Sequence, residues 1–213
     1  MNRAEPSPTR VVLASASPAR LQVLRNAGIS AEVVVSGVDE ESVRIDDPAA
    51  LALTLARMKA NAVADRLPAR PDERRVLIGC DSLLEFDGQA LGKPADAAAA
   101  IACWRAMRGG TGVLHTGHRV IVSEDGDERA TEAVASTVVR FAHLDDTEID
   151  AYVATGEPLW VAGAFTVDGL GGPFVTAIEG DYHNVVGLSL PLLRTLLLEL
   201  GVAWPTLWNE PLR

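Results

Sequence analysis

The segment 113–141 constrains the fold of this chain more than any other. Residues 113–123 and 130–141 are long runs of strand-forming residues, and the acidic turn 124–127, Glu-Asp-Gly-Asp, separates them. Two long strands joined by a short turn predict an antiparallel pair. Because short apolar runs alternate with helical segments in the rest of the chain, the sequence predicts an α/β domain with a mixed sheet.

The other predicted strands are shorter and more apolar. Residues 11–14 form a first strand, 33–35 a second, buried one, and 76–80 a central strand that ends in Asp81. Asp87 and Gly88 predict a two-residue hairpin turn. Residues 165–178 are also strand-like, although three glycines interrupt them.

Capping residues mark the predicted helix starts. Ser17 followed by Pro18 predicts a helix that ends at Gly28. The remaining predicted helices span 49–67, which is rich in alanine and leucine, 96–107, a segment from the capping box at Asp145 to about residue 155, and 189–200.

Composition and charge limit the function classes. The 213 residues are 48% hydrophobic and 23% charged, the profile of a folded protein, and their number predicts one core or two closely joined lobes. We expect a single domain over 11–213 preceded by a flexible N-terminus, 1–10. With 29 acidic and 19 basic side chains the net charge is −10, which argues against a nucleic-acid polymer as partner. A small anion is not excluded, because a few basic residues in a cleft can dominate locally.

Cysteine usage and hydropathy indicate the compartment. Cys80 and Cys103 are the only cysteines, too few for a disulfide scaffold, so we expect a reducing environment. The N-terminus lacks the apolar core of a signal peptide, and the most apolar stretch, 188–200, is too short to cross a bilayer. The sequence therefore predicts a cytoplasmic protein without a membrane partner.

The turn 15–20, Ser-Ala-Ser-Pro-Ala-Arg, is the first candidate binding site. Ser15 and Ser17 offer hydroxyls, the helix start offers unpaired backbone N–H groups, and Arg20 adds a guanidinium. Together these groups suit an anion, phosphate in particular. An ordinary serine-capped helix with an exposed arginine is the alternative interpretation.

Asp81, at the end of an apolar run, is the second candidate. A buried carboxylate costs several kcal/mol unless a cation or hydrogen-bond donors compensate it. Lys93 lies beyond the hairpin in a turn bracketed by Gly92 and Pro94. A carboxylate for a divalent metal and an ammonium for a phosphate would form a functional pair. A local surface ion pair is the alternative.

Several other charged residues are ambiguous by themselves. Glu40 lies in an acidic run that is typical of a solvated loop and could also supply a metal ligand. Lys59 lies on the alanine-rich helix, where a surface lysine is the alternative. His115 and His118 would face opposite sides of a strand, which is wrong for a shared metal, so we interpret both as structural or surface residues.

Three blocks of sequence resemble the Maf-like nucleotide pyrophosphatases. Residues 13–20, LASASPAR, resemble the opening L-A-S-x-S-P-R-R signature of that family. CDS at 80–82, together with GKP at 92–94, resembles the family's second block, D-T…G-K-P. TGEP at 155–158, AGAF at 162–165 and GDYHNVVGL at 180–188 resemble its third block. The matches occur in the family's order and extend from about residue 11 to residue 200.

The resemblance implies both a fold and an activity. The fold is an elongated mixed β-sheet with flanking helices, with two lobes around a nucleotide cleft, as in Maf and inosine-triphosphatase-like proteins. The activity is hydrolysis of a nucleoside triphosphate between the α and β phosphates, with a divalent metal, Mg²⁺ or Mn²⁺, as cofactor. A homodimer is also implied.

Position by position, the resemblance assigns roles to residues of this chain. Asp81 corresponds to the catalytic carboxylate, and it would hold the metal together with Glu40. The residues expected to bind the phosphates are Ser15, Ser17, Arg20, Lys59 and Lys93.

Three departures from the family pattern bear on base choice. Ala19 replaces the first arginine of the R-R pair, and Ser82 stands where many members have threonine. Asp168 occupies a position associated with base choice, where the best-known branches have glutamine or glutamate. Ser82 and Asp168 are therefore the expected selectivity residues, and the acidic Asp168 favours donors on a base edge.

Two alternatives stay open at this point. One is a pyrophosphatase specific for a modified nucleotide. The other is a nucleotide-binding regulator of cell division or septum formation with little turnover.

Overall fold

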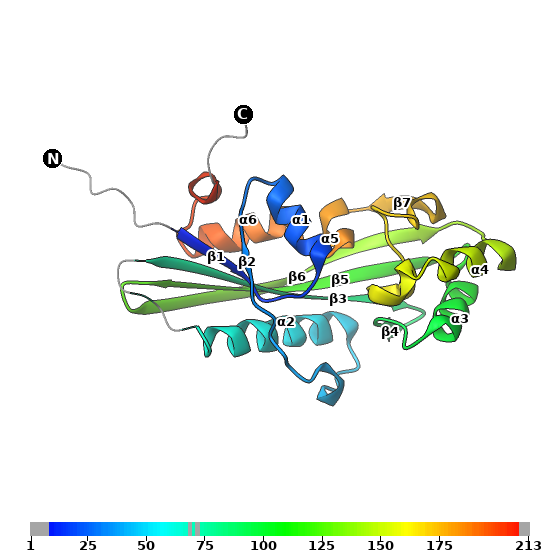
Figure 1. Ribbon diagram of the computed structural model, residues 1–213, viewed down its shortest axis with the longest axis horizontal. Coiled ribbons are helices and arrows are strands. Elements are labelled where there is room, and N and C mark those ends of the chain that lie inside the picture. Colours follow the sequence, from blue (N-terminus) through cyan, green and yellow to red (C-terminus); the bar gives the residue numbers. More distant parts are fainter. Residues whose placement is uncertain (1–8, 68–69, 71–72, 209–213) are drawn as a thin grey trace.

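One seven-stranded mixed sheet runs the length of the molecule (Figure 1). The computed structural model describes residues 9–67, 70 and 73–208. Its strands are β1 (Thr9–Leu13), β2 (Glu32–Val33), β3 (Arg74–Phe86), β4 (Gln89–Leu91), β5 (Thr111–Glu124), β6 (Asp127–Phe141) and β7 (Val175–Glu179). They are ordered β2-β1-β3-β5-β6-β7, with β4 paired to β3. β1 is parallel to β2 and β3, and every other pair is antiparallel, which confirms the mixed sheet.

Helices cover both faces of this sheet. They are α1 (Pro18–Asn26), α2 (Pro48–Ala64), α3 (Ala97–Met107), α4 (Asp146–Ala154), α5 (Tyr182–Val186) and α6 (Leu190–Glu199). In Figure 1, α1, α5 and α6 lie on one side of the sheet and α2 on the other, while α3 and α4 lie at the far end. This arrangement gives the elongated shape that the resemblance implied.

The core is divided in a way that defines two lobes. One cluster packs α1 and α6 against β1, β3 and β5, and a smaller one lies under α2. A separate cluster fills the far end around Trp104, whose ring makes edge contacts with Phe141, Tyr152 and Phe174. The long strands β3, β5 and β6 run through both lobes and join them.

The predicted helix starts are confirmed by their caps. Ser17 caps α1, and Asp145 and Glu148 form the predicted capping box at α4. Ser189 accepts a hydrogen bond from Leu192 N at the start of α6. The Asp87–Gly88 turn also joins β3 to β4 as predicted.

Three strand predictions are wrong in extent. The segment 33–35 is not a buried strand, because β2 ends at Val33 and the side chains of Val33 and Val35 are exposed, although Val34 packs against the cluster under α2. Only Val175–Glu179 of the segment 165–178 is a strand. The expected strand at 76–80 does not end at Asp81, and β3 continues to Phe86. The strand can continue because the polar side chains of Asp81 and Ser82 find polar partners on the two faces of the sheet.

The N-terminal boundary also differs slightly from the expectation. β1 begins at Thr9, within the segment 1–10 that was expected to be flexible, and residues 1–8 lie outside the described residues. Across the described residues no helix combines the length and apolar character needed to span a membrane.

Two glycines let α2 approach the sheet unusually closely. A Cβ on Gly79 would lie 2.6 Å from Ala56 O, and one on Gly117 would lie 2.4 Å from Ala52 O. The facing residues on α2 are buried alanines. Because neither side carries a bulky side chain, the α2 backbone rests almost directly on β3 and β5.

His118 is a buried neutral link between the sheet and α6. Its Nδ1 lies 3.0 Å from Thr116 O, and its Nε2 accepts a hydrogen bond from Ser189 N at 2.9 Å. These partners fix the tautomer with the proton on Nδ1. Burial, the main cause, lowers the pKa of His118 to about 4. The structure thus confirms a structural role for this histidine.

This lowered pKa predicts acid sensitivity of the fold. Between about pH 6.5 and pH 4 the unfolded chain binds a proton at His118 that the folded chain does not. The free energy of unfolding therefore falls as the pH drops through this window, by on the order of 3 kcal/mol from this group. Urea unfolding of His118→Gln should show a shallower pH dependence than the wild type, whereas the exposed-site variant His143→Gln should not. Parallel curves for His118→Gln and the wild type would contradict this assignment.

Candidate active site

The site is built on a stretch of β3 that is paired on one edge only. β1 pairs with β3 up to Ile78, and β4 begins to pair at Leu84 on the same edge. Within the described part of the chain, residues 79–83 therefore have a strand partner only on the β5 side. Side chains alternate along a strand, so Cys80 and Ser82 face one side of the sheet and Asp81 the other.

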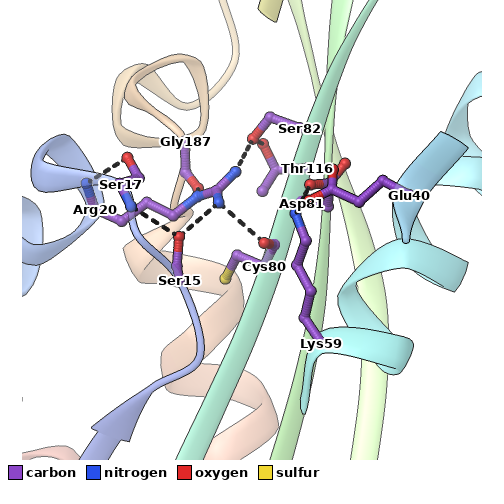
Figure 2. A network of polar contacts seen from close by, with 10 residues as sticks. All are labelled: Ser15, Ser17, Arg20, Glu40, Lys59, Cys80, Asp81, Ser82, Thr116 and Gly187. Atoms are coloured by element: carbon purple, nitrogen blue, oxygen red, sulfur yellow. Dashed lines mark hydrogen bonds and ion pairs between the residues drawn. The ribbon is translucent and has the colours of Figure 1, made fainter. Parts of the chain in front are cut away.

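Arg20 occupies the open edge from the α1 side (Figure 2). Its Nη1 donates to Cys80 O and to Ser15 Oγ, both at 3.0 Å, and its Nη2 donates to Ser82 Oγ at 2.8 Å. Its Nε donates to Gly187 O at the end of α5 at 2.7 Å. The guanidinium therefore ties α1, β3 and α5 together.

This network changes the role expected for the first turn. Arg20 has five N–H donors, and four of them are used by these partners, so one Nη2 hydrogen is left for a ligand. Ser15 is buried and accepts from Ser17 N and Arg20, while Ser17 caps α1 by accepting from Arg20 N at 3.4 Å. Both hydroxyls keep a hydrogen that can be donated.

On the opposite face of β3, Asp81 meets the ammonium of Lys59. The two groups are ion-paired and both residues are buried. Lys59 Nζ also lies 2.8 Å from Oε1 of the half-exposed Glu40. Figure 2 shows the lysine rising from α2 to a point between the two carboxylates. Three of the expected site residues are therefore brought together, at the place where α2 rests on the glycines of the sheet.

Burial dominates the electrostatics of Asp81. It raises the pKa of the carboxyl above its usual range, while the positive charges of Lys59 and Arg20 oppose that shift. A carboxylate with a raised pKa is a stronger base than an exposed aspartate. Asp81 is therefore suited to accept a proton.

Neither Lys93 nor Asp168 is hydrogen-bonded or ion-paired to Arg20 or to the Lys59–Asp81 pair. Lys93 is exposed on the turn after β4 and forms no ion pair with any other described residue. Asp168 is exposed on the loop 166–171 and lines a surface hollow. Ala19 and Tyr182 also line this hollow, whereas Asp81 and Lys59 do not. Of the two residues expected to govern base choice, Asp168 lines this hollow and Ser82 does not; Ser82 accepts a hydrogen bond from Arg20.

Two residues of the network were missed by the sequence analysis. Thr116 is buried on β5, 2.9 Å from Ser82 Oγ, and it donates to Asn184 O. The Asn184 amide donates to Leu114 O, Ala135 O and Thr137 Oγ1 and so anchors α5 to the two long strands. Pairing the predicted strands in register would have placed Thr116 opposite Ser82, but no local signal marks Asn184 as buried.

The carboxylates fit a magnesium or manganese ion better than a zinc ion. The described residues contain no group of three or more histidine, cysteine or acidic side chains that would hold a metal by themselves. Glu40 and Asp81 offer two hard oxygen donors that converge on one cation, the Lys59 ammonium. One or two carboxylates, completed by phosphate oxygens and water, is the usual coordination of Mg²⁺ at nucleotides.

Comparison with known proteins identifies the family of this chain. The Maf-like protein family matches residues 10–200, and the chain belongs to that family. A nucleoside triphosphate pyrophosphatase of Salinispora tropica is 60% identical over 95% of this chain and 89% of the relative. One of Streptomyces coelicolor is 59% identical over 93% and 94%.

A solved structure, the Ham1 protein of Staphylococcus aureus, is much less similar. Its TM-score is 0.33 at 13% identity, covering 63% of this chain and 72% of that chain. This likeness is too slight to bear on the fold or the function.

The Arg20 network predicts that this residue supports the fold as well as any ligand. Arg20→Met removes the Arg20 donors to Gly187 O and Cys80 O and one of the partners of Ser15 Oγ and of Ser82 Oγ, and it should lower the free energy of unfolding by about 2–4 kcal/mol. Urea unfolding should show this loss. Arg25→Met, at an exposed position of the same helix, is the matched control and should be close to neutral. Equal stability of the two variants would mean that the network contributes nothing to folding.

Proposed function

We propose that this protein hydrolyses nucleoside triphosphates at the α–β phosphate bond and releases a nucleoside monophosphate and pyrophosphate. The observation that carries the proposal is the buried Asp81 with its cation Lys59 and the second carboxylate Glu40 at an open edge of β3. Membership of the Maf-like family and the names of the relatives support it.

The substrate brings about four negative charges that the site must balance. Lys59 would contact a phosphate once its present partners are shared with a metal. The remaining Nη2 hydrogen of Arg20 and the hydroxyls of Ser15 and Ser17 offer donors from the other side of the open edge. Lys93 would have to be brought to the phosphates by a movement of its exposed turn.

The chemical step requires a base and charge stabilisation rather than a covalent nucleophile. A water oxygen attacks the α phosphorus, the bond from that phosphorus to the bridging oxygen breaks, and pyrophosphate leaves with the bond's electron pair. Asp81 accepts the proton that the water loses. Lys59 offsets negative charge next to the reacting phosphate.

A divalent metal ion is part of the proposal. Glu40 and Asp81 would hold Mg²⁺ or Mn²⁺ together with phosphate oxygens. Such an ion, when bound, neutralises phosphate charge and lowers the pKa of bound water.

Base choice is assigned to Asp168 and Ser82. Asp168 can accept hydrogen bonds from an exocyclic amine or a ring N–H, a preference that also suits a modified nucleotide. Its position in the hollow beside Ala19 supports this role, since the small side chain leaves room there. A homodimeric, cytoplasmic enzyme without a nucleic-acid partner stays the prediction from sequence.

Removal of the proposed base should stop the reaction. Asp81→Asn keeps the size of the side chain but cannot accept the proton, so pyrophosphate release should fall by at least about a thousandfold. The control Asp87→Asn, in the exposed hairpin turn of the same strand, should retain full activity. Pyrophosphate assays and thermal unfolding of both variants make the test. Undiminished turnover by a folded Asp81→Asn protein would eliminate Asp81 as the base. Absence of turnover by the wild-type protein would instead favour a nucleotide-binding regulator.

Metal dependence provides a second test. Chelation of divalent ions should abolish hydrolysis, and added Mg²⁺ or Mn²⁺ should restore it. Glu40→Gln should raise the metal concentration for half-maximal activity by about tenfold or more, because one of two carboxylate ligands loses its charge. Glu41→Gln, the exposed neighbour, should leave that concentration unchanged. Hydrolysis that persists in chelator would contradict the role of the metal.

A further inference from the structure

We infer that Glu157 is a positioning residue that fixes the loop 166–171 and thereby sets how strongly the protein discriminates among nucleobases. Glu157 does not line the hollow that Asp168 helps to form. It acts through the loop that carries Asp168. The inference rests on the proposed function, since it concerns the base selectivity of that site.

The carboxylate of Glu157 accepts four hydrogen bonds from neighbouring groups. Its Oε1 accepts from Thr166 Oγ1 at 2.5 Å, from Tyr152 OH at 3.0 Å and from Gly171 N at 3.1 Å. Its Oε2 accepts from Leu170 N at 3.0 Å. Three of these donors belong to the loop, so one side chain replaces the strand partner that the backbone of this segment lacks.

The charge of Glu157 is needed for this arrangement. Burial alone would raise the pKa of its carboxyl, but the hydrogen bonds from Thr166, Leu170, Tyr152 and Gly171 outweigh burial and lower it. All four partners donate, and only an ionised carboxylate accepts at both oxygens without a hydrogen of its own.

The glycines of the loop are explained by the same contact. A Cβ on Gly169 would lie 2.6 Å from Glu157 Oε2, and a Cβ on Gly171 would lie 2.4 Å from Tyr152 OH. The backbone thus wraps tightly around these two side chains. Any larger residue at either position would push the loop away from Glu157.

The loop presents Asp168 to the hollow between α1 and α5. Residues 168–170 are exposed, so little packing holds them in place. Asp168 lies close enough to Tyr182 for its charge to help raise the pKa of that phenol, after burial as the main cause. Because Glu157 holds the loop on both sides of Asp168, it determines where the Asp168 carboxylate lies relative to a base in the hollow.

The test compares base ratios rather than overall activity. kcat and KM are measured for wild type, Glu157→Gln, Asp168→Asn and the double variant with ATP, GTP, CTP, UTP, dTTP and ITP. In Glu157→Gln an amide faces backbone N–H donors, so the loop is released. We expect the ratio of kcat/KM between the best and worst nucleotide to fall by about tenfold, through KM, with kcat little changed. Because both changes act through one loop, the double variant should match Asp168→Asn alone.

Matched controls separate positioning from general destabilisation. Glu148→Gln removes a carboxylate that accepts Asp145 N in the neighbouring helix cap and should leave the base ratios unchanged. If Glu157→Gln does not fold, Thr166→Val, which removes one hydroxyl donor of the loop, should shift the ratios in the same direction by a smaller factor.

The outcomes distinguish this inference from the proposed function. Unchanged base ratios in a folded but less stable Glu157→Gln would overturn the positioning role while leaving the hydrolysis intact. Altered ratios in Glu157→Gln with none in Asp168→Asn would overturn it too, because the effect would not pass through Asp168. Should the wild type not hydrolyse any nucleotide, the proposed function fails. In that case the dissociation constants of α,β-methylene analogues with different bases are measured for the wild type and the variants. Ratios between bases that are the same in the wild type and the variants would overturn the positioning role.

Discussion

The close contact between α2 and the sheet is the constraint on which the candidate site depends. Gly79 and Gly117 place no side chain between α2 and the strands, and the residues of α2 that face them are alanines. At that separation the Lys59 ammonium is ion-paired with the carboxyl of Asp81 inside the protein. A buried carboxylate without a cation would cost several kcal/mol. The packing of small residues and the charge pair therefore depend on one another, and Lys59 is both a structural and a chemical group.

Two buried cations lie on opposite sides of one strand, and they differ in what holds them. Arg20 is bound by carbonyl and hydroxyl oxygens that are fixed in the fold, and nearly all of its donors are used. Lys59 is bound by two carboxylates, one of them half exposed. An ammonium can exchange such partners for phosphate oxygens, or share them with a metal, at little cost in geometry. The planar guanidinium of Arg20 cannot leave its four acceptors without loosening the contacts between α1, β3 and α5. The structure accordingly makes Arg20 the framework and Lys59 the adaptable group.

Local signals were enough to predict most helices and the long strands from the sequence. Ser17, Asp145 and Ser189 cap the helices as expected, because a cap depends on residues within a turn of each other. The errors arise where distant groups decide. The strand β3 continues through Asp81 because Lys59 and Arg20, from two separate helices, compensate the polar side chains there. The segment 165–174 is not a strand, because Glu157 binds backbone N–H groups that a neighbouring strand would otherwise take. The same holds for the site. The resemblance assigned residues to it, but the coordinates were needed to show that four of the five Arg20 donors are used and that Asp168 lines a hollow that Asp81 does not line.

The division of the molecule into two lobes has a consequence for how such a protein can diversify. Asp81 and Lys59 depend on the packing of α2, while Asp168 depends on a loop anchored in the far lobe by Glu157 and Tyr152. The contacts that hold one group are not shared with the other. Under the base role proposed for Asp168, a change in the loop would alter which nucleotide is accepted without disturbing the groups proposed for hydrolysis. New substrate ranges are then open to evolution, or to an engineer, by exchanging a few residues around an anchored turn while the reaction itself is inherited unchanged.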